Sequence, residues 1–348
     1  MTKLRKKIFV GLSGGVDSSV SALLLKQKGY DVTGVFIKGW QPDWIPCTWK
    51  IDRVSAMRTA AYLDIPFITL DLEKQYRDKV VSYLLEEYSK GNTPNPDMLC
   101  NREIKFGSFL NWAIKNGADY VATGHYAKVE DGMLYEGADK EKDQSYFLSQ
   151  LTQNELSKML FPLGDMKKNE VREIAKKNSL PVATRKDSQG ICFVGDLSMK
   201  EFLTKELNPK KGEVVNTQGE VIGEHDGAIL YTIGERHGFK LFGTEKGSES
   251  MFVISKDIDS NIIIVGDKKD EKENLRNSFE VKDLSLTKEI DLSSVKDLSV
   301  RLRYRSEKIS CKVLDENIIK LSKNAIVAPG QFAVFYEGNM CMGGGMII

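Results

Sequence analysis

The sequence contains few of the residues on which disulfide and metal architectures depend. Among its 348 residues there are five cysteines, three histidines and nine prolines. The cysteines are Cys47, Cys100, Cys192, Cys311 and Cys341, which are widely spaced and include no CxxC pair. This pattern argues against a disulfide framework and against a structural zinc site. It leaves individual thiols as candidates for chemistry.

Long apolar runs are also missing. No segment approaches the roughly 20 apolar residues of a membrane-spanning helix. The apolar stretch after the basic start ends at Ser13, too early for a signal peptide. Neither sign of charge dominates, because 50 Lys and Arg accompany 49 Asp and Glu. This balance neither predicts nor excludes nucleic-acid binding. We therefore expect a cytoplasmic globular protein with no membrane partner.

Residues 7 to 125 alternate between expected strands and helices. Apolar runs predict strands at 7–12, 32–37, 65–70 and 120–123, and the segments between them predict helices at 18–28, 51–63, 73–90 and 100–116. Such alternation indicates a parallel sheet with helices on both faces. Ligands of these sheets bind beyond the carboxyl ends of the strands, so functional residues are expected there.

The remaining sequence changes character twice. Residues 151–210 are predicted to be rich in helix, whereas residues 211–348 contain short alternating apolar runs between Gly, Asn and Asp turns. The second pattern is typical of a β-barrel or sandwich. We therefore predict an α/β protein with a Rossmann-like parallel sheet at 1–150, a small helical central region at 151–210 and a C-terminal β-barrel at 211–348.

The segment Gly11–Ser18 (GLSGGVDS) follows the first expected strand and opens a helix. Glycines let the backbone approach a ligand, and the unpaired N–H groups and dipole of a helix start favour an anion. The segment is neither a Walker A loop nor a dinucleotide fingerprint. We interpret it as a phosphate-binding loop rather than an ordinary Gly-Ser turn. Asp17 is expected to cap the helix or to hold Mg²⁺.

A stiff segment with two prolines, Thr93–Asn101 (TPNPDMLCN), places Cys100 near an expected helix start. The helix dipole lowers the pKa of a thiol at such a position. Asp97 lies one turn earlier, where it can cap the helix or accept a proton. A free cysteine is more often a small buried apolar residue, so both interpretations stay open.

A second cysteine, Cys192, lies between two glycines in the stretch KDSQGICFVG at 186–195. Glycines on both sides indicate a segment that can move. The alternative is a strand residue packed beside Ile191 and Phe193. These residues alone do not decide between the two.

Several motifs together resemble one family. They are PNPDxxCNxxIKF, ATGHYA at 122–127, KDQSYFL at 142–148, FPLG at 161–164, DSQGICF, YTIGxR and a terminal GGG. The sequence is similar to the bacterial tRNA 2-thiouridylases almost from end to end. Its phosphate loop resembles that of the N-type ATP pyrophosphatases, which implies cleavage of ATP to AMP and pyrophosphate.

The resemblance implies a mechanism and its residues. ATP is expected, with Mg²⁺, at Gly11, Leu12, Ser13, Gly14, Gly15, Val16, Asp17, Ser18, Ile37 and Gly124. The wobble uridine is expected beside Asn95, Pro96 and Asp97, and its C2 oxygen is adenylylated. Cys192 then carries a persulfide, Cys100 is the nucleophile, and Asp97 is the general acid/base. Cys100 and Cys192 close a transient disulfide, or Cys100 first helps to release hydrogen sulfide.

The resemblance also implies partners. Contacts with tRNA are expected at His125, Lys142, Asp143, Gln144, Arg303, Tyr304 and Gln331. The tRNAs expected are those for Lys, Glu and Gln, and a cysteine desulfurase or sulfur-carrier protein is expected to donate the persulfide. Arg301, Arg303 and Arg305 alternate along a predicted strand and are expected to share one face. The alternative for these arginines is a solvated strand edge.

Two features depart from the family pattern. The stretch GWQPDWIPCTWK at 39–50 replaces a more usual acidic segment, and Glu235 stands where Gln is frequent. Two other functions also remain open. A ligase such as argininosuccinate synthetase, or an amidotransferase domain, shares the loop but does not need the two cysteines. A non-catalytic tRNA-binding protein of this fold would release no pyrophosphate.

Overall fold

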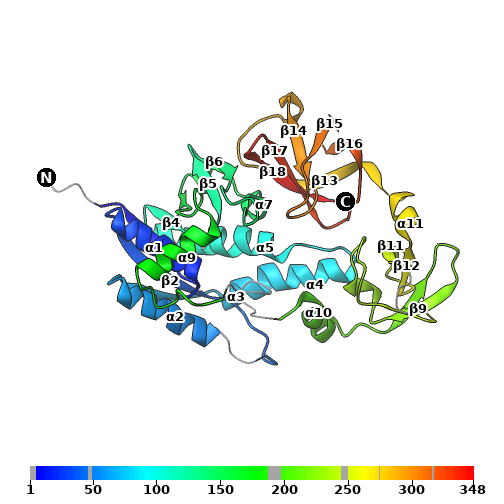
Figure 1. Cartoon of the computed structure of the whole chain (residues 1–348), viewed down its shortest axis with the longest axis horizontal. Coiled ribbons are helices and arrows are strands. Elements are labelled where there is room, and N and C mark those ends of the chain that lie inside the picture. Colours follow the sequence, from blue (N-terminus) through cyan, green and yellow to red (C-terminus); the bar gives the residue numbers. More distant parts are fainter. Residues whose placement is uncertain (1–4, 46–48, 187–196, 244–249, 274, 316) are drawn as a thin grey trace.

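The computed structural model describes residues 5–45, 49–186, 197–243, 250–273, 275–315 and 317–348. Cys47 and Cys192 lie outside these ranges. The described chain forms a parallel sheet with helices, a smaller mixed sheet, and a closed antiparallel barrel (Figure 1). The predicted fold class, a Rossmann-like α/β part followed by a β-barrel, is confirmed.

The N-terminal sheet has five parallel strands in the order β3-β2-β1-β4-β7. The strands are β1 (Lys7–Gly11), β2 (Asp31–Lys38), β3 (Phe67–Asp71), β4 (Tyr120–Ala122) and β7 (Met159–Leu160). The chain leaves β1 toward β2 on one side and reaches β4 on the other. The carboxyl ends of β1 and β4 are therefore the switch point at which such sheets bind ligands.

Both faces of this sheet are covered, and alternate residues of β1 show how. Ile8 and Val10 pack in one core with α1 (Val16–Gln27), α2 (Trp49–Tyr62) and α9 (Lys168–Lys177). Phe9 points to the other core, which contains residues of the helical runs at 73–89 and 96–115. This period of two is what a strand buried on both sides requires.

The two long helices on the second face each contain a π-helical segment. The first comprises α3 (Glu73–Tyr76), η1 (Arg77–Val81) and α4 (Ser82–Ser89); the second comprises α5 (Pro96–Leu99), η2 (Cys100–Phe109) and α6 (Leu110–Lys115). The second helix begins four residues before the predicted start at residue 100. Asn95 caps it with its side chain and Pro96 occupies the first helical position, where proline is favoured.

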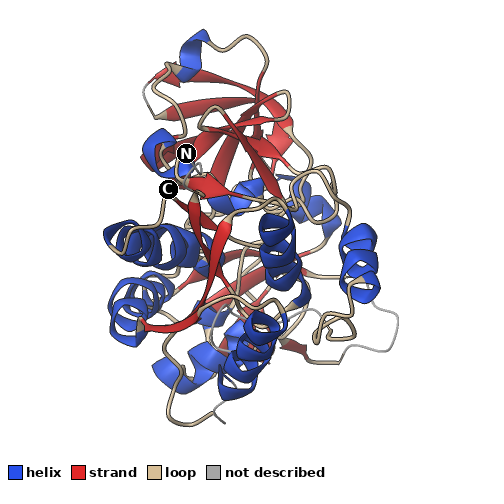
Figure 2. Cartoon of the chain, turned by 90° about the vertical axis from the view of Figure 1, so that its left-hand side faces the viewer, coloured by secondary structure: helices blue, strands red, loops and turns tan. Residues whose placement is uncertain are grey.

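The C-terminal barrel closes from six antiparallel strands in the order β13-β16-β15-β14-β17-β18, with β18 pairing back to β13. The strands are β13 (Arg276–Leu286), β14 (Leu298–Arg301), β15 (Ile309–Asp315), β16 (Ile318–Ala325), β17 (Phe332–Glu337) and β18 (Met340–Ile347), and η4 (Leu292–Ser294) lies between β13 and β14. Figure 2 shows these strands gathered at one end of the molecule, away from most helices.

A hairpin from the N-terminal half extends the barrel. Its strands β5 (Ala127–Glu130) and β6 (Met133–Glu136) follow β4, and β6 pairs with β18 through Leu134 and Tyr135. The short helices α7 (Ser145–Leu148) and α8 (Gln153–Leu156) come next in the chain. The sequence did not predict this hairpin. The hairpin links the N-terminal parallel sheet to the barrel through the backbone pairing of β6 with β18.

The part of the chain between these units forms a second sheet, in the order β10-β9-β8-β12-β11. Its elements are α10 (Met199–Leu207), β8 (Gly212–Val215), β9 (Val221–His225), η3 (Ala228–Leu230), β10 (Lys240–Leu241), β11 (Phe252–Asp257), β12 (Ile262–Gly266) and α11 (Lys268–Glu273). Both α10 and η3 contact α4. The predicted β-rich part at 211–348 thus holds two sheets, while the predicted domain boundaries stay a prediction.

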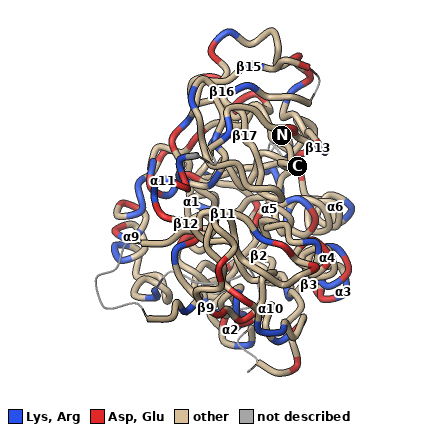
Figure 3. Tube along the Cα trace, turned by 90° about the vertical axis from the view of Figure 1, so that its right-hand side faces the viewer, with Lys and Arg blue, Asp and Glu red and all other residues tan. Residues whose placement is uncertain are grey.

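Charges are dispersed rather than grouped by sign. Figure 3 shows Lys and Arg interleaved with Asp and Glu along the described trace. Among the described helices, none combines the length and the apolar character needed to span a membrane.

Candidate active site

The predicted phosphate loop lies between β1 and α1, as expected. Gly15 is the N-cap of α1 and no side chain caps this end, which leaves the first N–H groups of the helix for a ligand. The Ser18 hydroxyl accepts from the Ser13 N–H at 3.2 Å and donates to the Gly15 carbonyl at 3.2 Å. Ser19 donates to the same carbonyl at 2.8 Å. The loop is thus held in shape by its own hydroxyl groups.

Two glycines are required for the loop to pack. Gly14 has a φ of +82°, and a Cβ there would lie 2.4 Å from the Asp52 carbonyl oxygen. Gly124 follows β4, and a Cβ there would lie 2.7 Å from the Ser18 nitrogen. The neighbouring strand end therefore touches the first turn of α1 backbone to backbone. Ile37, near the end of β2, is buried on the other side of β1.

Asp17 does not cap α1, which is one of the two roles expected for it. Its carboxylate accepts from Lys168 Nζ at 2.7 and 2.8 Å and from the Tyr126 hydroxyl at 2.8 Å. Within the described ranges, no group of three or more His, Cys, Asp or Glu side chains could hold a metal ion. A Mg²⁺ ion at Asp17 would therefore need phosphate oxygens to complete its ligands.

The segment before Cys100 is fixed by Asn95. Its side-chain oxygen accepts from the Asp97 and Met98 N–H groups at 3.1 and 3.2 Å, which satisfies two donors at the helix start. Asp97 lies in the first turn of this helix and is half-buried. Cys100 begins the π-helical segment and has no exposed surface. π-Helical turns are frequent at functional sites.

The helix of Cys100 is tied to the KDQSYFL motif. The Asn101 side chain donates to the Phe147 carbonyl at 3.1 Å. The ring of Phe147 lies 4.3 Å from that of Tyr304, centroid to centroid. Burial raises the pKa of the Tyr304 hydroxyl against the lowering effect of Arg305, and the Asp143 and Asp97 carboxylates raise it further. Predicted uridine-site and tRNA-site residues thus converge here.

Cys192, the predicted persulfide carrier, lies outside the described residues. Its distance to Cys100, the transient disulfide and the mobility expected for its segment therefore stay predictions. Of the other cysteines, Cys311 and Cys341 are buried, and burial raises the pKa of each thiol to about 12. Neither has the thiolate character that sulfur chemistry requires.

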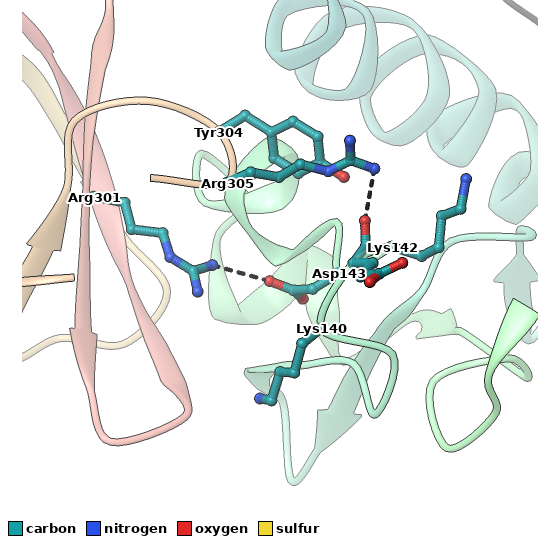
Figure 4. A pocket seen from close by; sticks show the side chains of 7 residues that line it. Lys140, Lys142, Asp143, Arg301, Tyr304 and Arg305 are labelled. Carbon is teal, nitrogen blue, oxygen red and sulfur yellow. Dashed lines mark hydrogen bonds and ion pairs between the residues drawn. The ribbon is translucent and has the colours of Figure 1, made fainter. Parts of the chain in front are cut away.

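A pocket of about 380 Å³ lies between the KDQ segment and the barrel (Figure 4). It is lined by Lys140, Glu141, Lys142, Asp143, Arg301, Tyr304 and Arg305. The guanidinium of Arg305 donates to the Glu141 carbonyl at 2.6 Å and lies 5.0 Å from the Tyr304 ring centre. Lys142 extends away from the Arg301–Asp143 pair (Figure 4), whereas Lys140 pairs at 3.0 Å with Glu136, which also pairs with Arg301. The pocket therefore combines cationic and aromatic groups, as nucleic-acid sites do.

Asp143 and Gln144, two of the residues predicted to contact tRNA, make hydrogen bonds within the protein. Asp143 is 3% exposed and accepts from the Gly137 and Ser145 N–H groups, the Ser145 hydroxyl and Arg301. The Gln144 side chain accepts from the Tyr126 N–H at 3.0 Å. These bonds fix the turn that presents Lys142. Their roles in tRNA binding stay predictions.

His125 is also interior. Its Nδ1 lies 2.6 Å from the Thr123 hydroxyl and its Nε2 lies 3.5 Å from Lys105 Nζ. Because an ammonium group cannot accept, Nε2 accepts from Lys105 and Nδ1–H donates to Thr123. Burial, and secondarily the charge of Lys105, lowers the pKa of His125 well below its ordinary value. The imidazole is therefore neutral at physiological pH.

The expected common face of three arginines is not found. Strand β14 ends at Arg301, and the chain then turns, with Arg305 at a φ of +62°. Arg301 pairs with Glu136 at 2.9 Å, whereas Arg303 donates to the Ile233 carbonyl at 2.7 Å. The strand alternation stops because the backbone leaves the extended region.

Gln331 and Arg303 connect separate parts of the fold. The Gln331 amide donates to the Thr93 carbonyl at 2.7 Å, so the barrel holds the segment that leads to Asn95. Arg303 reaches from the barrel to the second sheet through Ile233. Both are predicted tRNA contacts that also brace the domains.

Two basic residues at the loop were missed by sequence reasoning. Lys168 contacts Asp17, and Arg185 donates to the Gly14 carbonyl at 3.0 Å and pairs with Asp52. They lie more than 150 residues from the loop in the chain, so spacing gives no signal. Only the packing of α9 against α1 brings Lys168 there (Figure 1).

The protein belongs to the class of nucleotide-binding α/β proteins, because it has a parallel sheet with a phosphate loop at its switch point. Two β-units are appended to this sheet, and the pocket has the groups typical of nucleic-acid sites. Family models cover nearly the whole chain in the same order. Residues 6–196 match a tRNA methyl transferase HUP domain, 200–267 a tRNA methyl transferase PRC-barrel domain, and 276–347 an aminomethyltransferase beta-barrel domain.

Curated relatives specify the family. A tRNA-specific 2-thiouridylase MnmA from Streptococcus thermophilus is 44% identical over 99% of this chain and 95% of its own length. Proteins of the same name from Enterococcus faecalis and Listeria monocytogenes are 44% and 43% identical, over 99% and 98% of this chain and 95% and 94% of their own. The chain belongs to the tRNA-specific 2-thiouridylase family.

Solved structures show a weaker likeness. The U34-tRNA thiolase NcsA from Methanococcus maripaludis has a TM-score of 0.37 and 20% identity, covering 55% of this chain and 62% of that one. A 4-thiouridine synthetase–RNA complex with bound ATP has a TM-score of 0.35 and 17% identity, covering 58% and 50%. Likenesses this low say nothing about function.

Proposed function

We propose that this protein catalyses the ATP-dependent 2-thiolation of the wobble uridine of tRNA. The observation that carries the proposal is that one fold contains both a phosphate loop and the segment of Cys100. No side chain caps the helix N–H groups at the loop, whereas Asn95 caps the helix that contains Cys100. The chain is, in addition, 44% identical to a tRNA-specific 2-thiouridylase over 99% of its length. The tRNAs for Lys, Glu and Gln are the proposed substrates.

ATP binds with its phosphates on Gly11–Ser18 and its adenosine toward Ile37 and Gly124. The start of α1 supplies N–H groups and a positive dipole end for the phosphates. Asp17 would hold Mg²⁺, and the ion when bound would neutralise part of the phosphate charge.

The first chemical step joins AMP to the base. The C2 oxygen of uridine attacks the α-phosphorus, the bond from that phosphorus to the bridging oxygen breaks, and pyrophosphate leaves. The N3 proton of uridine must be lost for charge to balance, and Asp97 is the proposed acceptor. Asn95 fixes the backbone on which Asp97 lies, so it acts as a positioning residue.

The second step replaces oxygen by sulfur. The terminal sulfur of a persulfide on Cys192 attacks C2, and the C2–oxygen bond breaks to release AMP. The Cys100 thiolate attacks the inner sulfur, which leaves 2-thiouridine and a Cys100–Cys192 disulfide. The persulfide sulfur is reduced and the two thiols are oxidised, so a thiol reductant must reopen the disulfide. In the alternative order, Cys100 first releases hydrogen sulfide, which then attacks C2.

The persulfide comes from a cysteine desulfurase or a sulfur-carrier protein in the cytoplasm. Because Cys100 has no exposed surface, neighbouring side chains must move before sulfur can reach it. An unstacked anticodon base is accessible without opening a duplex. Lys142, Tyr304 and Arg305 line the pocket beside this site and are suited to contact the backbone and bases of the loop.

Nucleoside mass spectrometry of bulk tRNA tests the proposal. Cells lacking the protein should lose 2-thiouridine, and the wild-type gene should restore it. With purified protein, Cys100→Ser and Cys192→Ser should each abolish thiolation, whereas Cys311→Ser should not. AMP transfer to tRNA should survive Cys192→Ser, and its loss would contradict the assigned roles. Pyrophosphate release without thiolation by the wild-type protein and its donor would favour a different ligase.

A further inference from the structure

Two cations lie against the phosphate loop from a distant part of the chain. Lys168 is the first residue of α9, and its Nζ contacts both carboxylate oxygens of Asp17 at 2.7 and 2.8 Å. Arg185 follows α9 and contacts the Gly14 carbonyl and the Asp52 carboxylate. Packing of α9 on α1 places both groups beside the same loop.

Lys168 lies beside the first turn of α1, where the phosphates are proposed to bind. Asp17 is the second residue of α1, and its neighbours Val16 and Ser18 belong to the open first turn. The Lys168 side chain is 14% exposed and that of Asp17 is 32% exposed. An ammonium group bound to this carboxylate is therefore at the edge of the space that phosphates would enter.

A cation beside Asp17 would reduce the repulsion between its carboxylate and bound phosphates. A triphosphate placed at the first turn of α1 lies close to the negative Asp17, and like charges at this range repel. An ordinary ion pair would satisfy Lys168 without any ligand, which is the simplest explanation of the contact. That explanation, however, leaves the phosphates beside a neutralised pair with little added attraction.

We propose that Lys168 is a phosphate-binding catalytic residue that bridges Asp17 and the outer phosphates of ATP. This inference rests on the proposed binding of ATP at the loop. When the bond between the α-phosphorus and the bridging oxygen breaks, pyrophosphate gains one negative charge, and the ammonium group stabilises it. Lys168 stays protonated throughout, so it contributes charge and a donor, not a proton.

Arg185 has a different task. Its guanidinium donates to the carbonyl of Gly14, whose positive φ shapes the loop, and pairs with Asp52 on α2. It therefore acts as a positioning residue that fixes the loop backbone against α2. Its replacement should weaken binding of all phosphate ligands by displacing the loop.

Binding of pyrophosphate and of adenosine, measured separately by calorimetry in EDTA, tests the role of Lys168. Removing Mg²⁺ separates Lys168 from any metal held by Asp17. Lys168→Gln should weaken pyrophosphate binding about tenfold or more, the effect of one charge-assisted hydrogen bond. Adenosine binding should not change. Lys176→Gln, an exposed lysine on the same helix, is the matched control and should bind both probes normally.

A double variant separates phosphate binding from simple neutralisation of Asp17. Asp17→Asn removes the charge that Lys168 would mask. If Lys168 contacts phosphate, Asp17→Asn/Lys168→Gln should still bind pyrophosphate about tenfold more weakly than Asp17→Asn. Equal binding by these two variants would overturn the proposal.

Two further outcomes distinguish this inference from the proposed function. Wild-type protein that binds pyrophosphate, together with a Lys168→Gln variant that binds it equally tightly, would overturn the role of Lys168 alone. Wild-type protein that binds neither probe would overturn the phosphate loop, and with it both proposals.

Discussion

Replacing Gly124 by alanine should damage the ATP site while leaving the fold intact. The added Cβ would lie 2.7 Å from the Ser18 nitrogen and 2.8 Å from the Asp17 carbonyl carbon, against 3.4 Å for an ordinary contact. Because both neighbours are backbone atoms, the first turn of α1 must move by about 0.7 Å, the difference between 3.4 and 2.7 Å. No side-chain rotation can relieve this contact.

The magnitude follows from two effects. Overpacking of this kind costs about 1–3 kcal/mol of unfolding free energy. Displacement of binding groups by a sizeable fraction of an ångström costs catalysis more, since about 1 Å is enough for roughly a hundredfold loss. We therefore expect at least a tenfold rise in the KM for ATP. Urea unfolding and pyrophosphate release from ATP with tRNA are the two measurements.

Gly117→Ala is the control for backbone strain. Gly117 has a φ of +83°, and a Cβ added there would meet no atom within 4 Å, so alanine at this position should cost about 1 kcal/mol of stability from strain alone. Its KM for ATP should be unchanged. A Gly124→Ala protein with wild-type KM and wild-type stability would refute the view that β4 and α1 position the loop by close contact.

Three further predictions concern the links around the site. Burial raises the pKa of the Glu136 carboxyl, but Lys140, Lys308 and Arg301 lower it more, so the pKa lies below its ordinary value of 4.5. The ionised carboxylate therefore stabilises the fold above pH 4.5, and this stabilisation is lost as the pH falls through the lowered pKa. The Tm advantage of wild type over Glu136→Gln should accordingly shrink on acidification. Asn95→Ala should lower the unfolding free energy by about 1 kcal/mol and reduce thiolation with little change in ATP binding. Gly330→Ala should reduce both thiolation and Tm, because its Cβ would lie 2.5 Å from the Thr93 nitrogen.

Local pattern was enough to predict the parallel sheet and its loop. The strands at β1, β2, β3 and β4 are short apolar runs between glycines and charged residues, and their period of two survives in the packing of Ile8 and Phe9. The Gly11–Ser18 segment carries its own glycines and hydroxyls. Its shape therefore depends on residues that are close in sequence.

Contacts between residues far apart in the chain could not be predicted from local sequence patterns. The hairpin of β5 and β6 was not predicted, and its pairing with β18 joins it to a strand more than 200 residues away in the chain. The three arginines do not share a face because β14 ends at Arg301 and the chain then turns, with Arg305 at a positive φ. Lys168 and Arg185 reach the loop only through helix packing.

The predicted tRNA contacts also hold the protein together, and this changes how their substitution must be interpreted. Gln331 bonds the Thr93 carbonyl, Arg303 bonds the Ile233 carbonyl, and Asp143 pairs with Arg301. Loss of a buried or half-buried hydrogen bond of this kind costs roughly 0.5–3 kcal/mol of unfolding free energy even without RNA. A fall in thiolation is therefore evidence of lost RNA contact only when the KM for tRNA rises and Tm does not fall.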